Sequence, residues 1–428
     1  MHETEQEMLA HWAQRCAAGK GRSEAEVLAG AAGRINQLRK ADGAVRVMDA
    51  SGKPLAGVPV TVEQTNHAFL FGCNAFMVLS YDDPGLEEAY ERQFAALMNY
   101  ATLGFYWGSY ERAPGETREK LMRAQAEWCA RRGILTKGHP LIWHEVYPKW
   151  GPSDAEETRR LLRARVKSIV SGFAGLVDRW DVVNEASVSA NFDNGVGAWA
   201  RRDGAARLVA EALEWAREAN PRACLLYNDY NYWPPDYGFE RLAGELVETG
   251  APCDAFGLQS HWHSGERPLN WVWELCEAYA RFGKPLHFTE VTVVSGEHGW
   301  MRPQPWPTTR EGEARQAEYV AALYTLLFSH PAVEAITWWD FPDGLWQGAP
   351  AGLVRADLTP KPVYQRLMDL VKGCWWTREE LRTGADGVAR FRGFLGGYRV
   401  VVGEGGRQVE RSFTLERGAA NELAAVVG

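Results

Sequence analysis

Short apolar runs alternate with amphipathic stretches over most of the chain. The runs have the character of buried parallel strands and cover 67–73, 100–105, 134–138, 178–183, 222–227, 254–259, 285–290 and 333–339. Each is followed by apolar residues at helical spacing, in 86–98, 117–132, 155–173, 200–218, 237–249, 270–282, 311–329 and 361–371. Alternating strands and helices predict an α/β fold, a (β/α)8 barrel.

The two ends of the chain have a different pattern. Residues 3–40 have helical spacing, and 44–62 contain two alternating stretches around a turn rich in Asp, Ser, Gly and Pro, which predicts a β-hairpin. Near the C-terminus 387–391, 398–402 and 411–415 alternate in the same way. Because neither set has enough strands to be stable alone, we expect the two to pair into one small discontinuous β-sandwich-like module. Two separate decorations of the barrel are the alternative.

These patterns predict four segments. Their ranges are 1–43 for an N-terminal helical segment, 44–65 for the first half of the β-module, 66–372 for the catalytic barrel and 373–428 for the second half of the module.

Two of the apolar runs end on a glutamate. The stretch WDVVNEA (180–186) contains Glu185, and LHFTE (286–290) ends on Glu290. Barrels carry their chemistry at the carboxyl ends of the strands, so both side chains are expected at one rim. Two carboxyl groups at one site are what cleavage of a glycosidic bond requires. The alternative is that each glutamate merely caps a strand or pairs with an arginine.

Composition narrows the class of protein further. With 46% hydrophobic and 24% charged residues the chain is an ordinary soluble globule, and its net charge of −8 argues against nucleic acid or an anionic membrane as a partner. Many of the 19 Trp and 15 Tyr residues are expected in the core, and the remainder suit a sugar-binding cleft. No stretch reaches membrane-spanning length, and the acidic start shows no signal peptide, which leaves a cytoplasmic protein or a secreted one whose leader was removed.

The seven cysteines are scattered and show no zinc-binding spacing, so we expect reduced core thiols and neither a metal nor a cofactor.

Several short motifs together resemble glycoside hydrolase family 10, the family of endo-β-1,4-xylanases. They occur in the order and spacing of that family and span most of 66–370: GHPLIWH (138–144), WDVVNEA (180–186), NDYN (228–231), GLQSH (257–261), TE (289–290) and PKPVY (360–364). No single motif is decisive, but the set is highly specific.

The resemblance implies roles for individual residues. Glu185 would be the acid/base and Glu290 the nucleophile of a retaining double displacement. The expected substrate-binding residues are His139, Trp143, Asn184, Gln259, His261, Trp339, Trp346 and Tyr230. Asn184 would donate to the sugar 2-hydroxyl, while Trp339 would form a wall behind the reacting sugar, with Trp338 turned the other way.

Some of these residues have simpler interpretations. Asn184 could cap its strand, His139 could be a core histidine and His261 a surface one. Asp229 and Tyr230 fit a structural role better than a contact with sugar.

Three departures from the family affect recognition of the sugar. The Glu, Asn and Lys that usually bind the outer non-reducing-side sugar are replaced by Thr102, Leu103 and Tyr106, so an aromatic platform of Phe105, Tyr106 and Trp107 is expected there. Thr292 stands where the family usually has Asp, which removes a charged partner of His261. The loop that leads to Trp346 is one residue shorter than usual, which leaves the register of that residue open.

The sequence therefore predicts a retaining glycoside hydrolase that cleaves β-1,4-xylosidic bonds in xylan or xylo-oligosaccharides. One alternative is the same mechanism on another β-glycoside or β-linked polysaccharide. The other is a catalytically silent carbohydrate-binding protein.

Overall fold

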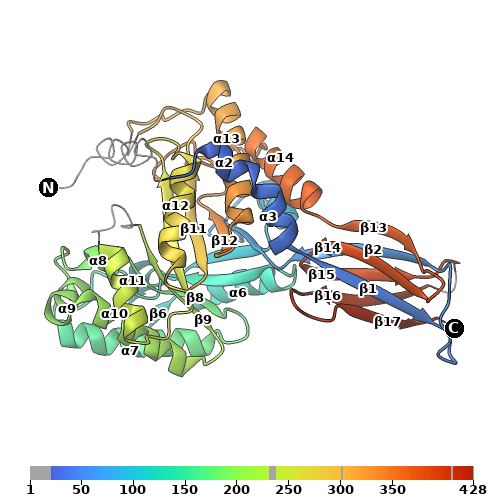
Figure 1. Cartoon of the computed structure of the whole chain (residues 1–428). Coiled ribbons are helices and arrows are strands. Elements are labelled where there is room, and N and C mark those ends of the chain that lie inside the picture. Colours follow the sequence, from blue (N-terminus) through green and yellow to red (C-terminus); the bar gives the residue numbers. More distant parts are fainter. Residues whose placement is uncertain (1–20, 231–237, 300–301, 406–407, 428) are drawn as a thin grey trace.

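Eight parallel strands close into a barrel in the computed structural model, which describes residues 21–230, 238–299, 302–405 and 408–427 (Figure 1). In their order around the barrel the strands are β3 (Leu70–Asn74), β4 (Tyr100–Gly104), β7 (Leu135–His139), β8 (Arg179–Asn184), β9 (Cys224–Asp229), β10 (Ala255–Trp262), β11 (Leu286–Val293) and β12 (Val333–Trp338). The last strand pairs with the first, so the predicted (β/α)8 barrel is confirmed.

A helix follows each barrel strand. The eight are α4 (Pro84–Leu97), α6 (Glu119–Ala130), α7 (Ala155–Gly172), α10 (Ala205–Ala219), α11 (Gly238–Glu248), α12 (Leu269–Ala280), α13 (Arg310–Ser329) and α14 (Pro362–Met368), the last continuing as a π-helix over Asp369–Cys374. Short elements fill the loops at the carboxyl ends of the strands: α5 (Trp107–Tyr110), β5 (Glu111–Ala113), β6 (Glu116–Thr117), α8 (Ala186–Ser189) and α9 (Gly195–Asp203).

The single helix predicted over 200–218 is wrong, because Gly204 interrupts it. Gly204 has φ +87°, a left-handed conformation that ends α9 and lets α10 begin in a new direction.

The barrel interior is polar at mid-height. Lys137 and Asp181 are fully buried there and form an ion pair with an Nζ–Oδ2 distance of 2.5 Å, and Thr102 and Thr337 are buried beside the same strands. Buried charges need such pairing to be tolerated. Toward the amino ends of the strands the filling becomes apolar, with Leu70, Tyr100 and Ala335 in contact. The polar layer therefore continues upward into the carboxyl-end rim.

The two ends of the chain meet in one β-sandwich, here called the terminal β-module (Figure 1). One sheet has the order β14 (Val388–Phe394), β1 (Lys40–Met48), β17 (Glu422–Val426). The other has the order β13 (Arg378–Arg382), β2 (Pro59–His67), β15 (Gly396–Val402), β16 (Val409–Leu415). Strands from both ends share each sheet, so the predicted pairing is confirmed and two separate decorations are excluded.

The hairpin predicted over 44–62 is wrong. β1 and β2 lie in different sheets, and the connection from Asp49 to Val58 crosses between them. The reason is the core: Val45 and Val47 of one sheet pack with Val60 and Val62 of the other. Only strands in opposite sheets can bury both of these alternating faces against each other.

The module is attached at the amino end of the barrel strands. Only Ala68 and Phe69 separate the end of β2 from the start of β3. Arg39, just before β1, donates to the carbonyls of Phe328, His330 and Val333 at 2.7–2.8 Å, which ties the junction to the end of α13. The module therefore lies at the opposite end of the barrel from the carboxyl-end rim.

The N-terminal helices α2 (Glu24–Ala29) and α3 (Ala31–Leu38) pack on α12 and α13. Residues 1–20 of the helical segment predicted over 3–40 lie outside the described residues. Six cysteines fall within the described residues, and all six are free thiols.

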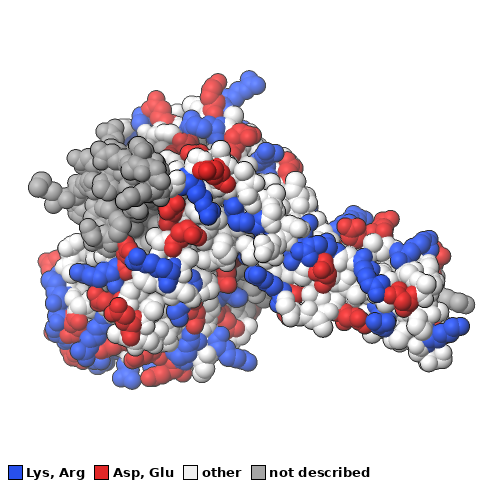
Figure 2. Space-filling view, in the orientation of Figure 1, with Lys and Arg blue, Asp and Glu red and all other residues white. Residues whose placement is uncertain are grey.

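No helix in the described part of the chain has both the length and the apolar character needed to cross a bilayer. Acidic and basic side chains alternate over the barrel and the module on the face shown in Figure 2, so neither sign dominates the described surface there.

Candidate active site

Glu185 and Glu290 both lie at the carboxyl-end rim and are buried, with 8% and 5% exposure. Glu185 follows β8 and precedes α8, and its φ of +56° is in the left-handed region. A bulky residue adopts that conformation only where the surroundings enforce it, and such positions cluster at functional sites. Here the Glu185 N–H donates to the Asn228 carbonyl at 2.8 Å, which holds the turn.

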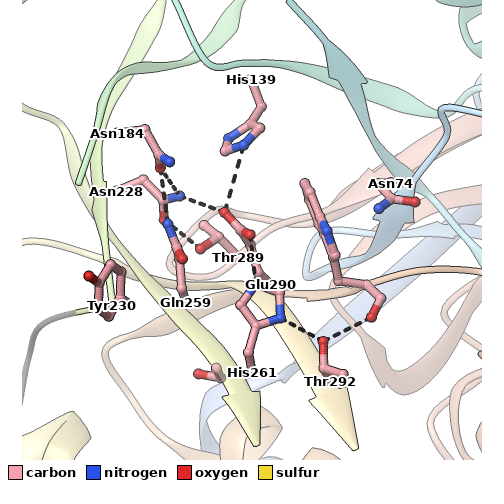
Figure 3. Close-up of polar contacts among 12 residues, drawn as sticks. Asn74, His139, Asn184, Asn228, Tyr230, Gln259, His261, Thr289, Glu290 and Thr292 are labelled. Carbon is pink, nitrogen blue, oxygen red and sulfur yellow. Dashed lines mark hydrogen bonds and ion pairs between the residues drawn. The ribbon is translucent and has the colours of Figure 1, made fainter. Parts of the chain in front are cut away.

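A chain of amides joins the two carboxyl groups (Figure 3). Asn228 Nδ2 donates to Glu290 Oε1 at 2.8 Å and to Asn184 Oδ1 at 2.7 Å. Gln259 Nε2 donates to the same Asn184 oxygen at 3.1 Å and to Glu185 Oε1 at 2.9 Å. Strands β8, β9, β10 and β11 thus all contribute side chains to a single network that holds both glutamates in one site.

Glu185 lies in surroundings that favour its neutral form. Burial raises its pKa to about 8, and the charge of Glu290 adds to this effect. Hydrogen bonds from Gln259 and from Trp143 Nε1, which lies 2.8 Å from Glu185 Oε2, oppose the rise without cancelling it. Glu185 therefore carries a proton at neutral pH.

Glu290 lies in surroundings that favour its charged form. Burial alone would raise its pKa, but His139, His261 and Lys137 together hold the pKa below its usual value. His261 Nε2 lies 2.9 Å from Glu290 Oε2, and His139 Nε2 lies 3.8 Å from Oε1. Glu290 is therefore an ionised carboxylate, and it lies beside the protonated carboxyl group of Glu185.

Thr292 fixes the proton on the far side of His261. Its hydroxyl donates to the Trp339 carbonyl at 2.9 Å, so its oxygen accepts from His261 Nδ1–H at 2.7 Å. This contact fixes the orientation of the ring, with Nε2 directed at Glu290 Oε2. The residue that departs from the family thus still orients His261, with a neutral hydroxyl in place of a charge.

His139 is held from below by the buried ion pair of the barrel interior. Asp181 Oδ2 accepts from His139 Nδ1 at 2.8 Å and also contacts Lys137. Burial opposes ionisation of Asp181, but Lys137 and His139 outweigh it and its pKa is lowered. An ionised acceptor at Nδ1 turns Nε2 of His139 toward Glu290.

Aromatic rings surround the two carboxyl groups. Trp339 packs edge to face on His139, with ring centroids 5.3 Å apart, and lies 6.4 Å from His261. Trp346 stacks on His261 with centroids 4.7 Å apart, which settles its register despite the shorter loop. Trp338 is fully buried and donates to the Ala351 carbonyl, away from the site.

Tyr230 lies at the edge of the site. It is 48% exposed, whereas its neighbour Asp229 is buried and accepts from the Tyr227 hydroxyl and the Ser187 amide. Burial of its hydroxyl, together with Glu185, raises the pKa of Tyr230 to about 12. Its ring thus faces the opening on the Glu185 side.

The predicted platform of Phe105, Tyr106 and Trp107 is wrong in two of its three members. Phe105 packs inward against Phe173 and Trp180, and Trp107 packs against Tyr147 and Trp150. Only Tyr106 faces the site, with its ring against His139 and Trp143 at 5.3 and 5.6 Å. Consecutive residues at the end of a strand alternate in direction, so three neighbours cannot share one surface.

Sequence reasoning missed His144 and Asn228 as members of the site. His144 is buried against Phe192, and its Nε2 lies 3.8 Å from Glu185 Oε2. Burial lowers the pKa of His144 to about 4, so it adds to the low-dielectric surroundings of Glu185 as a neutral ring. Both residues stand in the quoted motifs, which was the available signal.

His144, Glu145 and Glu185 are also the described group best placed to hold a metal ion, with ligand atoms within 4.8 Å of one another.

A (β/α)8 barrel with a protonated and an ionised glutamate at its carboxyl-end rim defines the class of barrel glycoside hydrolases. The model of Glycosyl hydrolase family 10 matches residues 83–370, and the chain belongs to that family. It is similar to endo-1,4-beta-xylanase B of Thermotoga neapolitana, with 30% identity over 58% of this chain and 72% of that protein. Like these xylanases it is a glycoside hydrolase.

A solved structure agrees with this assignment. Xylanase 10B from Thermotoga petrophila RKU-1 in complex with xylobiose superposes with a TM-score of 0.61 and 26% identity, covering 71% of this chain and 94% of that one.

Another relative extends over the terminal β-module. Anti-sigma-I factor RsgI6 of Acetivibrio thermocellus is 27% identical over 90% of this chain, which spans 48% of that protein's length.

Proposed function

We propose that this protein hydrolyses β-1,4-xylosidic bonds in xylan or xylo-oligosaccharides with retention of the anomeric configuration. The observation that carries the proposal is the hydrogen-bonded network at the carboxyl-end rim that joins Glu185 and Glu290, in surroundings that favour the protonated form of the first and the ionised form of the second. Glu185, with a pKa of about 8, holds a proton to donate, and Glu290, with a lowered pKa, is ready to attack. A retaining glycosidase needs this division of roles at the start of the reaction.

In the first step a Glu290 oxygen attacks the anomeric carbon. The glycosidic carbon–oxygen bond breaks, and Glu185 gives its proton to the departing oxygen. Esterification of Glu290 then removes the negative charge that had raised the pKa of Glu185. Glu185, now ionised, takes a proton from water, whose oxygen displaces Glu290 from the sugar.

Asn184, Gln259, His139 and His261 support these steps. Asn184 Nδ2 lies 3.1 Å from Glu185 Oε1 and is placed to bind the 2-hydroxyl of the reacting sugar. His139 and His261 hold the two Glu290 oxygens from opposite sides. Trp339 and Trp143 supply flat faces for the sugar ring, while Trp346 and Tyr230 extend this apolar lining at the opening.

The test uses aryl β-glycosides and polymeric xylans, with the anomeric form of the first product followed by NMR. Glu290→Gln abolishes turnover on all substrates. Glu185→Gln slows substrates with poor leaving groups strongly but spares the first step of 2,4-dinitrophenyl β-xyloside, whose leaving group needs no proton. Glu214→Gln, a change of the same kind on the exposed face of α10, serves as control and leaves the rate unchanged.

An inverted first product, or near-normal turnover by Glu290→Gln, contradicts the proposal.

A second candidate function is carbohydrate binding without turnover. Wild-type protein that binds xylo-oligosaccharides but releases no product from any aryl β-glycoside would favour it.

A further inference from the structure

Two buried polar residues at the rim take no part in the reaction scheme. Asn74 ends β3, and Asp340 follows β12, the neighbouring strand that closes the barrel. Asn74 Nδ2 donates to Asp340 Oδ1, and the two residues are 2% and 6% exposed. Burial raises the pKa of Asp340 to about 7 against the effect of this hydrogen bond, and the charge of Glu290 raises it further. A third carboxyl group therefore lies within the electrostatic reach of the nucleophile.

Polar atoms around this pair lack protein partners. Among the described residues no hydrogen bond reaches the second carboxylate oxygen of Asp340 or the hydroxyl of Tyr106. Burial raises the pKa of Tyr106, with the charges of Glu290, Asp340 and Glu185 contributing, and its ring lies against His139 and Phe76 beside the pair. Neither atom is among the buried polar atoms that lack a partner, so both are open to solvent and a sugar hydroxyl can reach them.

Four aromatic side chains form a continuous wall beside these atoms, here called the aromatic wall: Phe76, Tyr106, Trp143 and Trp339. Ring centroids are 5.3 Å apart for Phe76 and Trp339, 5.9 Å for Phe76 and Tyr106, and 5.6 Å for Tyr106 and Trp143. These are contact distances for aromatic pairs. A sugar between two rings would hold them roughly 7–8 Å apart, at two van der Waals contacts, so no sugar passes between the members of the wall.

The polar pair and the part of the wall formed by Phe76, Tyr106 and Trp339 lie on the non-reducing side of the reacting sugar, and Trp143, which donates to Glu185, ends the wall on the other side. Glu185 protonates the leaving group, so that group extends on the Glu185 side of the site. Figure 3 shows Asn74 on one side of Glu290, with Asn184 and Tyr230 on the other. The sugar attacked by Glu290 therefore lies toward β12, β3 and β4, where the next sugar of a longer chain would have to continue.

We propose that Asn74, Asp340, Tyr106 and the aromatic wall form a closed subsite for one terminal sugar, so that the enzyme removes single sugars from the non-reducing end. Asp340 and Tyr106 bind free hydroxyls of that sugar, and the wall blocks a further unit attached at its 4-oxygen. This inference rests on the proposed hydrolysis and specifies its mode.

The first test compares 4-nitrophenyl β-xyloside, its 4-O-methyl analogue and 4-nitrophenyl β-xylobioside. The closed subsite predicts a kcat/KM for the xyloside at least tenfold above the values for release of nitrophenol from the other two. Equal or higher values for the xylobioside overturn the proposal.

Variants separate the wall from the polar pair. Phe76→Ala combined with Tyr106→Ala opens the wall and shifts the xylobioside-to-xyloside ratio at least tenfold toward the xylobioside. Tyr106→Phe and Asp340→Asn keep the wall and raise KM for the xyloside more than they lower kcat. Tyr364→Phe removes a hydroxyl that donates to the Gln93 carbonyl outside the site, and it leaves the ratio unchanged.

A binding measurement tests the subsite without turnover. Tryptophan fluorescence of the Glu290→Gln variant is titrated with methyl β-xyloside and with its 4-O-methyl derivative. Binding at least tenfold weaker for the derivative supports the closed subsite, even if wild-type protein hydrolyses nothing and the proposed function fails. Equal binding of the two sugars overturns the closed subsite, even if hydrolysis is confirmed.

Discussion

Glu185 and Glu290 are identical side chains whose surroundings push their protonation in opposite directions. Glu185 is buried near the negative charges of Glu290 and Asp229, with the uncharged ring of His144 close by, whereas Glu290 lies against His139 and His261. The residue type therefore does not determine which glutamate is the acid and which the nucleophile. The neighbouring side chains from other strands determine it.

The rate of hydrolysis should follow a bell-shaped pH profile. Activity requires Glu290 ionised and Glu185 protonated. Because the pKa of Glu290 is lowered, activity should persist to a pH below the usual carboxyl range, and because the pKa of Glu185 is about 8, it should fall above pH 8. Values of kcat/KM measured from initial rates between pH 3 and 10 check the acid and alkaline limbs of the profile. An alkaline limb near pH 5 would contradict the surroundings assigned to Glu185.

Glu185→Gln should gain stability relative to wild type as pH rises. A carboxyl group with a raised folded-state pKa contributes most below its unfolded value near 4.5, and that contribution is lost as pH rises toward 8. Between pH 4 and 7 the difference in unfolding free energy between variant and wild type should grow by about 3 kcal/mol. Chemical denaturation at both pH values measures it, and a pH-independent difference would refute the assignment.

Thr292→Val should shift the acid limb of the pH profile to a higher pH. The change removes the acceptor of His261 Nδ1–H, so the ring is no longer held with Nε2 toward Glu290, and the ionised form of Glu290 loses part of the hydrogen bond that lowers its pKa. Thr292→Ser retains the hydroxyl and should restore the profile. An effect on unfolding free energy alone, with an unchanged profile, would reduce Thr292 to a packing residue.

The two glutamates were predictable from sequence because each ends an apolar run within a recognisable motif. Asp340 and Asn74 were not, because their meeting depends on the pairing of the first barrel strand with the last. Tyr106 was identified, but its two neighbours were wrongly placed with it on one surface.

Strand β7 depends on a glycine for its contact with β8. A Cβ atom at Gly138 would lie 2.1 Å from the Trp180 ring, so the ring rests directly on the backbone. Gly138 stands between Lys137 and His139, and any shift there reaches the site. The position of His139 therefore depends on the contact between Gly138 and Trp180 on the opposite face of the same strand.

Gly138→Ala should lower both stability and activity. Overpacking of this kind costs about 2 kcal/mol, and displacement of β7 should reduce kcat/KM through His139. Thermal unfolding and initial rates measure the two effects. Gly33→Ala, within α3 and with no atom within 4 Å of the added carbon, is the matched control and should be neutral or slightly stabilising.

The barrel elements were predictable because strand and helix periods differ clearly along the chain. The hairpin over 44–62 was not, because alternation shows which face of a strand is buried but not which strand lies beside it. Gly204 was visible in the sequence, yet a glycine within a helical pattern does not by itself reveal a break.

The two largest apolar cores of the described residues lie in the barrel and in the terminal β-module. The site lies at the carboxyl ends of the barrel strands, and the module is attached at their amino ends. The site and the module therefore lie at opposite ends of the barrel. A substitution that destabilises one core need not destabilise the other.

Removal of residues 417–428 should destabilise the module without silencing the site. The truncation deletes β17, which pairs with β1 from Ala44 to Met48, and uncovers that strand. We expect a lower midpoint for unfolding of the module in calorimetry and faster amide exchange in β1. The rate on an aryl β-glycoside at 25 °C should be unchanged; its loss while the module stays folded would show coupling between the two ends.

The shared sheets of the module also impose an order on synthesis. β1 emerges from the ribosome long before its partners β14 and β17, which follow only after the entire barrel has been translated. At about 5–20 residues per second this delay is on the order of tens of seconds. During that time β1 and β2 of the terminal β-module lack the strands that pair with them, so the whole barrel is translated while these two strands are still unpaired.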